Sequence, residues 1–197
     1  MLTVATVYHQ GLIVPDWSTC YTPEWVDKLY RGVARNYTKP FRFVCLTDNA
    51  YKFQEDIETH SLWTTQWEKA CIQLYGVQAK RLVLMGLDTI ITGNVDHIFA
   101  YNGPLAVPRD PYTPERACNG VVLCPTRTDI VARTGISDMR ILDYFDKEWL
   151  DDLFPGQIKS YKVNVLPQGL GDARIVYFHG EPKPHVLNDP WIQECWQ

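Results

Sequence analysis

The sequence contains 197 residues, of which 46% are hydrophobic and 21% charged, in proportions that are ordinary for a globular protein and exclude a disordered or low-complexity chain. The net charge is −4 and no block of Lys or Arg interrupts the sequence, so nucleic acid is excluded as the expected partner. Because the length is about 1.3 times that of a ~150-residue domain, we expect one domain over residues 1–197.

Signals for a membrane or for export are missing from the sequence. No stretch reaches the ~20 apolar residues that span a bilayer. The first ten residues have neither the basic segment nor the long apolar core of a signal peptide. The six cysteines include no Cys-x-x-Cys pair, so a structural zinc site is not expected. We therefore expect a cytoplasmic protein with reduced cysteines and no transmembrane segment.

Strands and helices are expected to alternate in the first half of the chain. Residues 2–8, rich in Val and Thr, indicate a first strand. A capping Thr22, followed by Pro23 and Glu24, begins a helix that apolar spacing extends to about residue 37. The further expected elements are a strand at 41–46, a short strand at 57–62, a helix at 66–75 that Gly76 ends, and a strand at 81–87.

Short strands are expected to dominate the second half. In chain order we expect an apolar strand piece at 90–92, a helical turn at 94–99, strands at 105–107 and 121–124, an amphipathic helix at 137–150 that Ser137 caps, and strands at 161–165 and 174–178. This order predicts an α/β fold with a mixed, mostly parallel central sheet flanked by helices. Since ligands of such sheets bind beyond the carboxyl ends of the strands, residues that directly follow strands are the first site candidates.

The most informative segment runs from the helix that carries Lys69 to Phe99 and ends in RLVLMGLDTIITGNVDHIF. It places an apolar strand before Gly-x-Asp-Thr, then an apolar pair and Gly-Asn-x-Asp-x-x-Phe. This order resembles the nucleotide-sugar site of GT-A fold glycosyltransferases, above all family 8, the glycogenin and galactosyltransferase group with its shorter bacterial relatives. That family's strand ends in Asp-x-Asp-Thr, whose carboxylates hold the Mn²⁺ or Mg²⁺ that neutralises the donor diphosphate.

The sequence departs from the family pattern at the first of these carboxylates. Gly86 occupies that position, so the motif is degenerate and only Asp88 remains. The resemblance implies that Asp88 contacts the donor and binds the metal ion alone or through water, with an affinity that the missing carboxylate weakens or abolishes. The alternative is that Asp88 only hydrogen-bonds the following turn. Lys69 matches the family's helix lysine behind the donor site, with a surface lysine as the alternative.

A second match is RIVYFHGEPKPH, residues 174–185. It resembles the family motif His-x-x-Gly-x-x-Lys-Pro-Trp, in which His binds the metal while the Gly backbone and the Lys approach the diphosphate. Aligned on Gly180 and Lys183, the metal-binding position holds Tyr177, and His179 lies two residues further on, on the same face of an extended strand. The resemblance thus implies donor contacts by Gly180 and Lys183, and His179 becomes a candidate metal ligand. The alternatives are a solvated loop lysine and a hydrogen-bonded histidine at a strand end.

Two weaker matches supply sugar-facing candidates. Asn119, in Cys-Asn-Gly-Val, resembles the family's strand asparagine that faces the donor sugar. Asp138, between Ser137 and Met139, resembles the aspartate of a Gly-Asp-Gln helix start near the reacting carbon, and a plain acid at a helix start is the alternative. Met139 replaces the glutamine, so the resemblance does not carry over the sugar contact of that side chain.

Loop ends complete the candidate site. Asp110 follows a strand end and is the second catalytic candidate. Thr6, Tyr8 and His9 end the first strand, where the family holds the base and ribose, and Thr6 and Tyr8 are donor candidates by that resemblance.

The resemblance implies a glycosyltransferase that moves a sugar from a nucleotide-diphosphate sugar, implied to be a UDP-sugar, to a carbohydrate or glycoconjugate acceptor with retention of configuration. The alternative is a catalytically impaired GT-A-like protein that binds nucleotide or glycan without turnover, because Gly86, Tyr177 and Met139 all remove polar ligands. A haloacid-dehalogenase-type phosphatase is disfavoured by Ile90, which stands where its second aspartate is required. A dinucleotide dehydrogenase lacks its Gly-x-Gly-x-x-Gly after the first strand, and a lectin would not explain both motifs.

Overall fold

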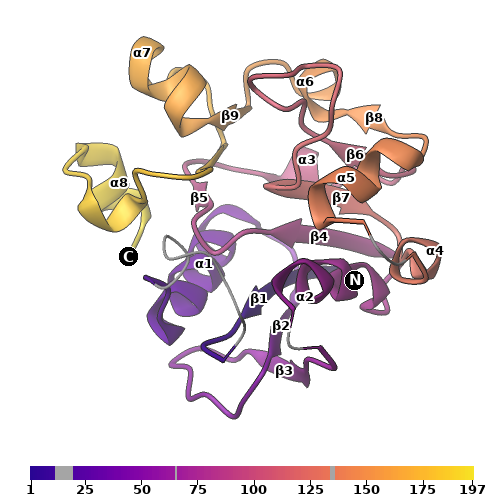
Figure 1. Ribbon diagram of the computed structural model, residues 1–197. Helices are drawn as coiled ribbons and strands as arrows, with labels where there is room; N and C mark the ends of the chain where they lie inside the picture. The colour runs from indigo at the N-terminus through magenta and orange to yellow at the C-terminus, as the bar shows by residue number, and fades with distance from the viewer. Residues whose placement is uncertain (12–19, 65, 134–135) are drawn as a thin grey trace.

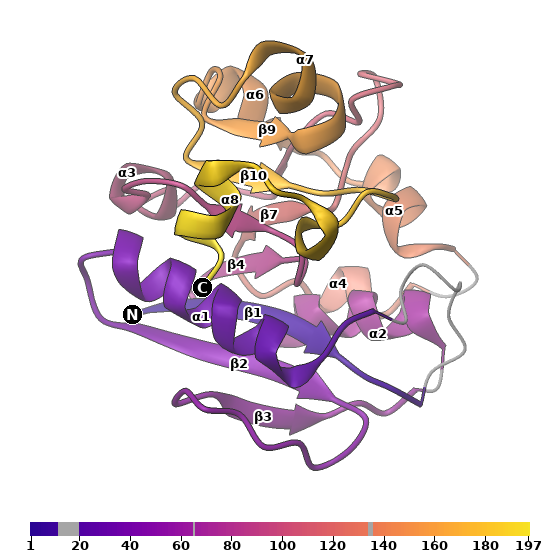
Figure 2. The same ribbon diagram turned by 90° about the vertical axis from the view of Figure 1, so that its left-hand side faces the viewer.

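The computed structural model describes residues 1–11, 20–64, 66–133 and 136–197. These residues form a seven-stranded sheet in the order β3-β2-β1-β4-β7-β6-β8 and a three-stranded sheet in the order β5-β10-β9. Figures 1 and 2 show α1 and α2 on opposite sides of the larger sheet. The predicted α/β class, with a mixed and mostly parallel sheet flanked by helices, is confirmed.

The parallel part of the larger sheet is built around β1. It consists of β1 (Leu2–Tyr8), β2 (Phe41–Thr47), β3 (Glu58–Ser61) and β4 (Arg81–Met85). β1 is buried along its whole length, as an apolar parallel strand covered on both faces must be. All four strands agree with the expected positions within about two residues.

Antiparallel pairing completes the larger sheet. β7 (Val121–Cys124) runs antiparallel to both β4 and β6 (Ala106–Val107), and β8 (Glu148–Trp149) runs parallel to β6. The end of β4 and the beginning of β7 therefore meet, since Met85 pairs with Val121. This brings the Gly86–Asp88 turn next to Asn119.

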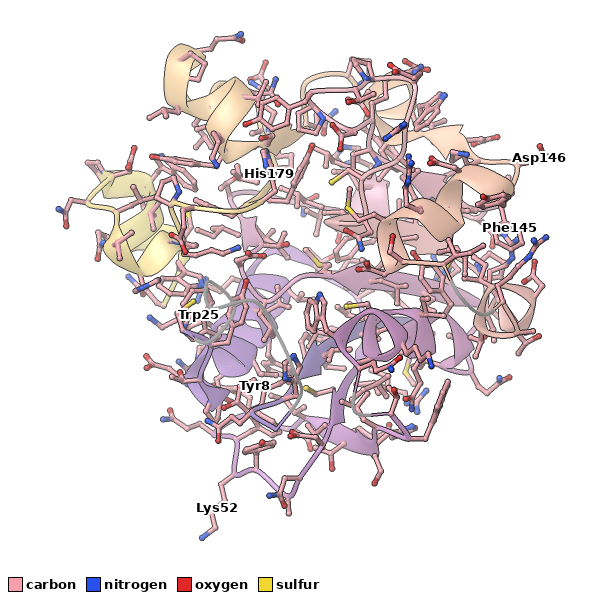
Figure 3. The ribbon with its side chains drawn as sticks, viewed as in Figure 1. Tyr8, Trp25, Lys52, Phe145, Asp146 and His179 are labelled. Atoms are coloured by element: carbon pink, nitrogen blue, oxygen red, sulfur yellow. The ribbon has the colours of Figure 1, made fainter. Side chains whose placement is uncertain are left out.

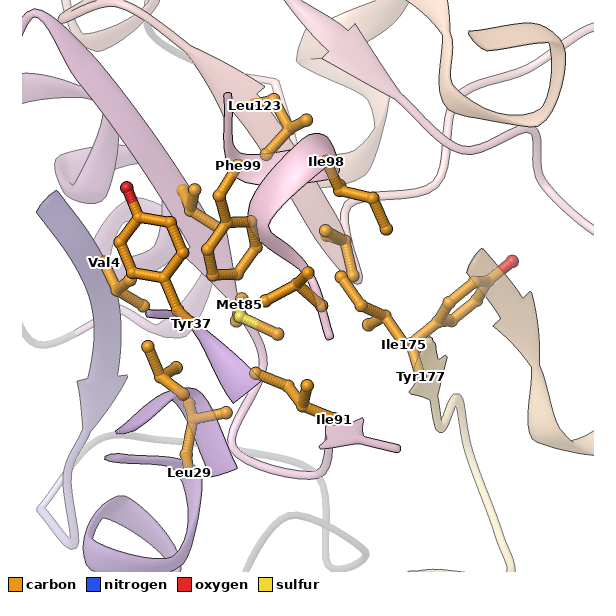
Figure 4. Close-up of a cluster of buried hydrophobic side chains, with 14 of the residues drawn as sticks. Val4, Leu29, Tyr37, Met85, Ile91, Ile98, Phe99, Leu123, Ile175 and Tyr177 are labelled. Atoms are coloured by element: carbon orange, nitrogen blue, oxygen red, sulfur yellow. The ribbon is translucent and has the colours of Figure 1, made fainter. Parts of the chain in front are cut away.

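Helix α1 (Pro23–Asn36) covers one face of the larger sheet. It begins with Pro and an acidic first turn as expected, but the Thr22 side chain makes no capping hydrogen bond. Its buried side chains Leu29 and Val33 pack with Val4 of β1 and Met85 of β4. Figure 4 shows this cluster, in which Tyr177 of the smaller sheet also takes part.

Three short helical segments cover the opposite face. They are α2 (Trp67–Gln73), the 3-10 turn η2 (Leu74–Gly76) that ends at the expected glycine, and α4 (Thr128–Val131). Ile72, Tyr75 and Ile130 pack there against Val7 and Leu84. The sheet thus has apolar side chains on both faces, because successive residues of a strand point to opposite sides.

The smaller sheet joins distant parts of the chain. It contains β5 (Ile90–Ile91), β9 (Ile158–Ser160) and β10 (Ile175–Tyr177). Helix α3 (Asp96–Phe99), the turn η5 (Pro184–Val186) and helix α8 (Pro190–Cys195) complete this side of the described chain. α8, which the sequence analysis did not predict, packs Ile192 into the cluster around Val176 and Phe178.

The predicted helix over residues 137–150 is confirmed only in its first turn and is wrong beyond it. The structure has a short helix α5 (Asp138–Ile141), a 3-10 turn η3 (Leu142–Tyr144), then β8 and helix α6 (Leu150–Leu153). Ser137 does cap α5, accepting a hydrogen bond from the Arg140 N–H at 3.3 Å. Pairing of Glu148 with Ala106 in β6 draws the chain away from the helix, so a tertiary contact overrides the helical spacing.

The predicted strand over residues 161–165 is also wrong. Tyr161–Val165 forms the π-helical turn η4, followed by α7 (Leu166–Gln168), and the strand is the preceding β9. The Ser160 hydroxyl accepts from the Val163 N–H, and the Asn164 side chain accepts from the Ser160 N–H. Such side-chain-to-backbone bonds compete with strand pairing and favour a turn.

None of the helices among the described residues is long and apolar enough to cross a membrane.

Candidate functional site

A cavity of about 490 Å³ lies beyond the carboxyl ends of β1, β4 and β10 and the beginning of β7. This volume is in the range of small-molecule binding pockets. Its lining comes from segments far apart in the sequence, such as Tyr8 at the end of β1 and His179 beyond the end of β10, both labelled in Figure 3.

Most of the predicted site residues line this cavity. They are Thr6, Tyr8, Asp88, Asp110, Asn119, Asp138, His179, Gly180 and Lys183. Lys69 does not: its side chain is exposed on α2. The topology therefore brings together two motifs almost 100 residues apart.

Asp88 is held at the turn after β4 by two side chains. Its Oδ2 atom accepts hydrogen bonds from the buried Lys183 ammonium and from the Tyr21 hydroxyl, the latter at 2.9 Å. Burial, and then the charge of Asp88, raise the pKa of Tyr21 far above its usual value, so Tyr21 is a neutral donor. Lys183 is only 1% exposed, and a lysine so deeply buried requires a charge partner. Asp88 and Lys183 thus join the two sequence motifs directly.

His179 lies beyond the end of β10 in the same cavity. Its Nε2 atom is 2.7 Å from the Ser160 Oγ, and the exposed ring of Tyr112 meets it edge-on at 5.4 Å. Burial, and then the positive charge of Lys162, lower the pKa of His179 below 6.5, so the ring is neutral at pH 7. Tyr177, in the family's metal-binding position, packs its ring against Gly120, where a Cβ would come within 2.9 Å of it.

Asn119 and Asp138 form a polar pair on another part of the cavity lining. The Asn119 amide donates to the Asp138 Oδ2 at 2.7 Å. Asp138 stands in the first turn of α5, directly after the capping Ser137. The cap fixes this short helix and therefore the position of the carboxylate.

Asp110 also reaches the cavity, but its carboxylate shapes a turn. Its Oδ1 atom accepts from the backbone N–H groups of Tyr112 and Thr113, at 2.8 and 2.9 Å. This is the local bonding of an Asx turn, and it orients the loop that carries Tyr112.

The end of β1 presents buried polar atoms to the cavity. Among the described residues, Thr6 Oγ1 and His9 Nδ1 are buried without a hydrogen-bond partner. The His9 ring lies 5.0 Å from Trp67, and burial lowers its pKa although the Asp48 carboxylate opposes the shift. Buried polar atoms nearly always have partners, so these atoms mark a place for a polar ligand.

An apolar wall faces the polar side chains. It is formed by Leu74, Tyr75, Leu84, Val122 and Met139. The site therefore combines charged, polar and apolar surfaces, as expected for a ligand with a ring system and an anionic group.

The residues present do not form a ready site for a divalent metal ion. Asp88 Oδ2 is held by Lys183 and Tyr21, and His179 Nε2 by Ser160. Across the described ranges, no group of three or more His, Cys, Asp or Glu side chains is placed to hold a metal. Hard divalent cations require several oxygen ligands, which this set does not offer.

Sequence reasoning missed Tyr21, which lines the cavity, and Lys162, which lies beside Gly180. Tyr21 lies two residues before α1 and carries no motif. Lys162 was placed within an expected strand, whereas it belongs to η4 beside Gly180. Only the folded contacts distinguish these residues from ordinary core and surface residues.

Comparison with known proteins gives structural matches only. No protein-family model and no curated protein sequence matches the chain. Among solved structures, the glycosyltransferase GlyE of Streptococcus pneumoniae TIGR4 superposes with a TM-score of 0.66 and 14% identity, over 95% of this chain and 57% of that one. The galactosyltransferase LgtC, solved with donor and acceptor sugar analogs, superposes with a TM-score of 0.59 and 9% identity, over 93% of this chain and 89% of that one. The bifunctional glycosyltransferase WbbM superposes with a TM-score of 0.57 and 10% identity, over 98% of this chain and 50% of that one.

These similarities establish the fold. The chain has the GT-A fold of these glycosyltransferases. It spans little more than half of the GlyE chain but about nine-tenths of the LgtC chain. At such low identity, likeness of fold alone leaves the activity to be argued from the site.

Proposed function

We propose that this protein is a glycosyltransferase that takes a sugar from a nucleotide-diphosphate sugar, with a UDP-sugar as the first donor to test. The observation that carries the proposal is the meeting of Asp88, Lys183 and Gly180 in one cavity of a GT-A fold. A buried ammonium near a glycine backbone suits an anionic diphosphate.

The other candidates have natural places in this proposal. Thr6 Oγ1 and His9 Nδ1, which have no partner among the described residues, would meet the nucleoside, and the Asn119–Asp138 pair would meet the donor sugar. Asp138 is the carboxylate that we assign to the reacting end of the donor. Asp110 would act by placing Tyr112 toward a carbohydrate acceptor, because an exposed ring can stack on a sugar.

A second candidate function is nucleotide or glycan binding without turnover. Two observations favour it. The Asp110 carboxylate is already hydrogen-bonded within its own turn, and Met139 contributes no polar group to the cavity. Retention of configuration stays a prediction of the family resemblance.

Binding of nucleotides by titration calorimetry tests the proposal. We expect UDP and at least one UDP-sugar to bind with micromolar affinity, and Thr6→Val to weaken binding about fivefold or more, because it removes a hydrogen bond to the ligand. The variant should fold at least as stably as the wild type, since it removes a buried hydroxyl without a partner in the described chain. Thr3→Val, a buried position of the same strand outside the cavity lining, is the matched control.

Turnover separates the two candidate functions. Release of UDP from a bound UDP-sugar, slowed by Asp138→Asn with UDP affinity unchanged, would support the transferase. Binding without any release over long incubation would favour the non-catalytic protein. If no nucleotide diphosphate bound, the donor site itself would be refuted.

A further inference from the structure

The cation beside Asp88 is a lysine ammonium. The Lys183 Nζ donates to the Asp88 Oδ2, which also accepts from the Tyr21 hydroxyl. A Cβ built on Gly86 would lie 2.9 Å from the Asp88 Oδ1. The second carboxylate of an Asp-x-Asp pair would therefore need space that the Asp88 side chain itself occupies. The absence of a side chain at position 86 and the pairing of Asp88 with Lys183 are thus parts of one arrangement.

A second lysine approaches the same place from η4. The Lys162 Nζ lies 3.4 Å from the position of a Cβ on Gly180. Lys162 is half-buried, and none of the ion pairs found in the described part of the chain involves it. Its charge also acts on His179, lowering the pKa of that ring. Lys162 thus brings a positive charge, without an acidic partner in the described ranges, beside the glycine that lines the cavity.

Gly180 allows close approach of an anion between these lysines. Its φ of 60° is a left-handed conformation that glycine adopts without strain. Gly180, His179 and Lys183 all line the cavity. A neutral His179 adds no repulsion to the lysines.

We propose that Lys183 and Lys162 together supply the positive charge that neutralises the donor diphosphate, so that nucleotide binding at this site requires no divalent metal ion. This inference rests on the proposed function. An ammonium group has three N–H donors, so Lys183 can hold the Asp88 carboxylate and a phosphate oxygen at once. Because the Asp88 carboxylate neutralises the charge of Lys183, Lys162 supplies the net positive charge that the diphosphate requires. The same two ammonium groups would stabilise the nucleoside diphosphate as it leaves.

Calorimetric titration of UDP in EDTA and in Mn²⁺ is the primary test. We expect the dissociation constants in the two buffers to agree within about threefold, which is well below the tenfold change of one strong interaction. Binding that requires Mn²⁺ would overturn the inference and leave the proposed function standing. Absence of binding in both buffers would overturn the proposed function, and this inference with it.

Lysine variants, titrated with UDP in EDTA, test the assignment of the charge. Lys162→Met should weaken binding about tenfold or more, because a charge-assisted hydrogen bond is lost. Lys52→Met is the matched control: Figure 3 shows Lys52 extending from the opposite end of the molecule to His179, and binding should not change. Equal affinities for the wild type and Lys162→Met would refute the role of Lys162.

Lys183 requires a variant that does not leave a buried charge. Lys183→Met alone would leave the buried Asp88 carboxylate without its charge partner, so it is combined with Asp88→Asn. Circular dichroism and cooperative unfolding check that the double variant folds. We expect this double variant to lose at least tenfold in UDP affinity in EDTA. Gly86→Asp should weaken UDP binding in EDTA, because its side chain competes with Asp88 for the same space. A folded double variant with wild-type affinity would contradict the inference.

Discussion

At the scale of single residues, the site depends on the partners that each polar side chain finds. Asp88 is buried and accepts hydrogen bonds from Lys183 and Tyr21, whereas one carboxylate oxygen of Asp110 accepts a hydrogen bond from the backbone of its own turn. Two aspartates that both follow strands therefore have different roles. The sequence identified both as candidates, but the distribution of their hydrogen bonds depends on side chains far away along the chain.

His9 is one residue whose titration should affect stability. Burial lowers its pKa below 6.5, so the unfolded chain binds a proton that the folded chain does not. The free energy of unfolding should consequently fall as the pH is lowered from about 7.5 to about 5.5. His9→Gln should show a smaller fall in urea denaturation, and His60→Gln on the exposed strand β3 is the control. Parallel pH dependence of the wild type and His9→Gln would contradict this assignment.

At the scale of elements, the termini of short helices decide where the functional groups lie. α5 has only four residues, too few to be stable alone, and it presents Asp138 through its first turn. β8 and η4 replace elements that helical or strand patterns had indicated. In each case side-chain caps or sheet pairing compete successfully with a weak local preference.

The cap of α5 gives a prediction at this scale. Ser137→Ala should cost about 1 kcal/mol in the free energy of unfolding, because the Arg140 N–H loses its acceptor. It should also weaken UDP-sugar binding more than UDP binding, since Asp138 faces the sugar in the proposed function. Thr22→Ala is the control: its hydroxyl makes no capping bond to α1, so the cost should be clearly smaller. Equal losses for both variants would show that the Ser137 bond has no stabilising role.

At the scale of the whole molecule, the smaller sheet and the C-terminal helix close around the first helix. Trp25 of α1 contacts the rings of Tyr21, His185 and Trp196, with centroids 4.8, 5.4 and 4.7 Å away. These contacts connect α1 with the segment that follows Lys183 and with the residue that follows α8. The position of Lys183 beside Asp88 therefore depends on packing between chain ends (Figure 2).

Trp25→Ala should therefore affect both stability and binding. Deleting this 5%-exposed side chain should cost about 3–5 kcal/mol in denaturant unfolding. It should also weaken UDP binding, because Tyr21 and the segment around Lys183 lose their packing against the Trp25 ring. Trp63→Ala removes an indole that is 62% exposed and should change stability by less than about 0.5 kcal/mol. A comparable loss in both variants would refute the connecting role of Trp25.

The sequence by itself determined the strands and helices that have strong local patterns. β1, α1, β2 and β4 were predictable because their apolar residues recur at strand or helix spacing and because turn residues bound them. The two motifs around Asp88 and Lys183 were readable for the same reason, since each is a contiguous segment.

Only the tertiary structure decided which of these residues meet. The ion pair of Lys183 with Asp88 spans 95 positions, and the Tyr21 hydroxyl joins it from before α1. Lys162 and Trp67 carry no local pattern that separates them from surface or core residues. Contacts of this kind arise from the pairing of distant strands and the burial of their side chains, which are properties of the folded chain and not of any segment.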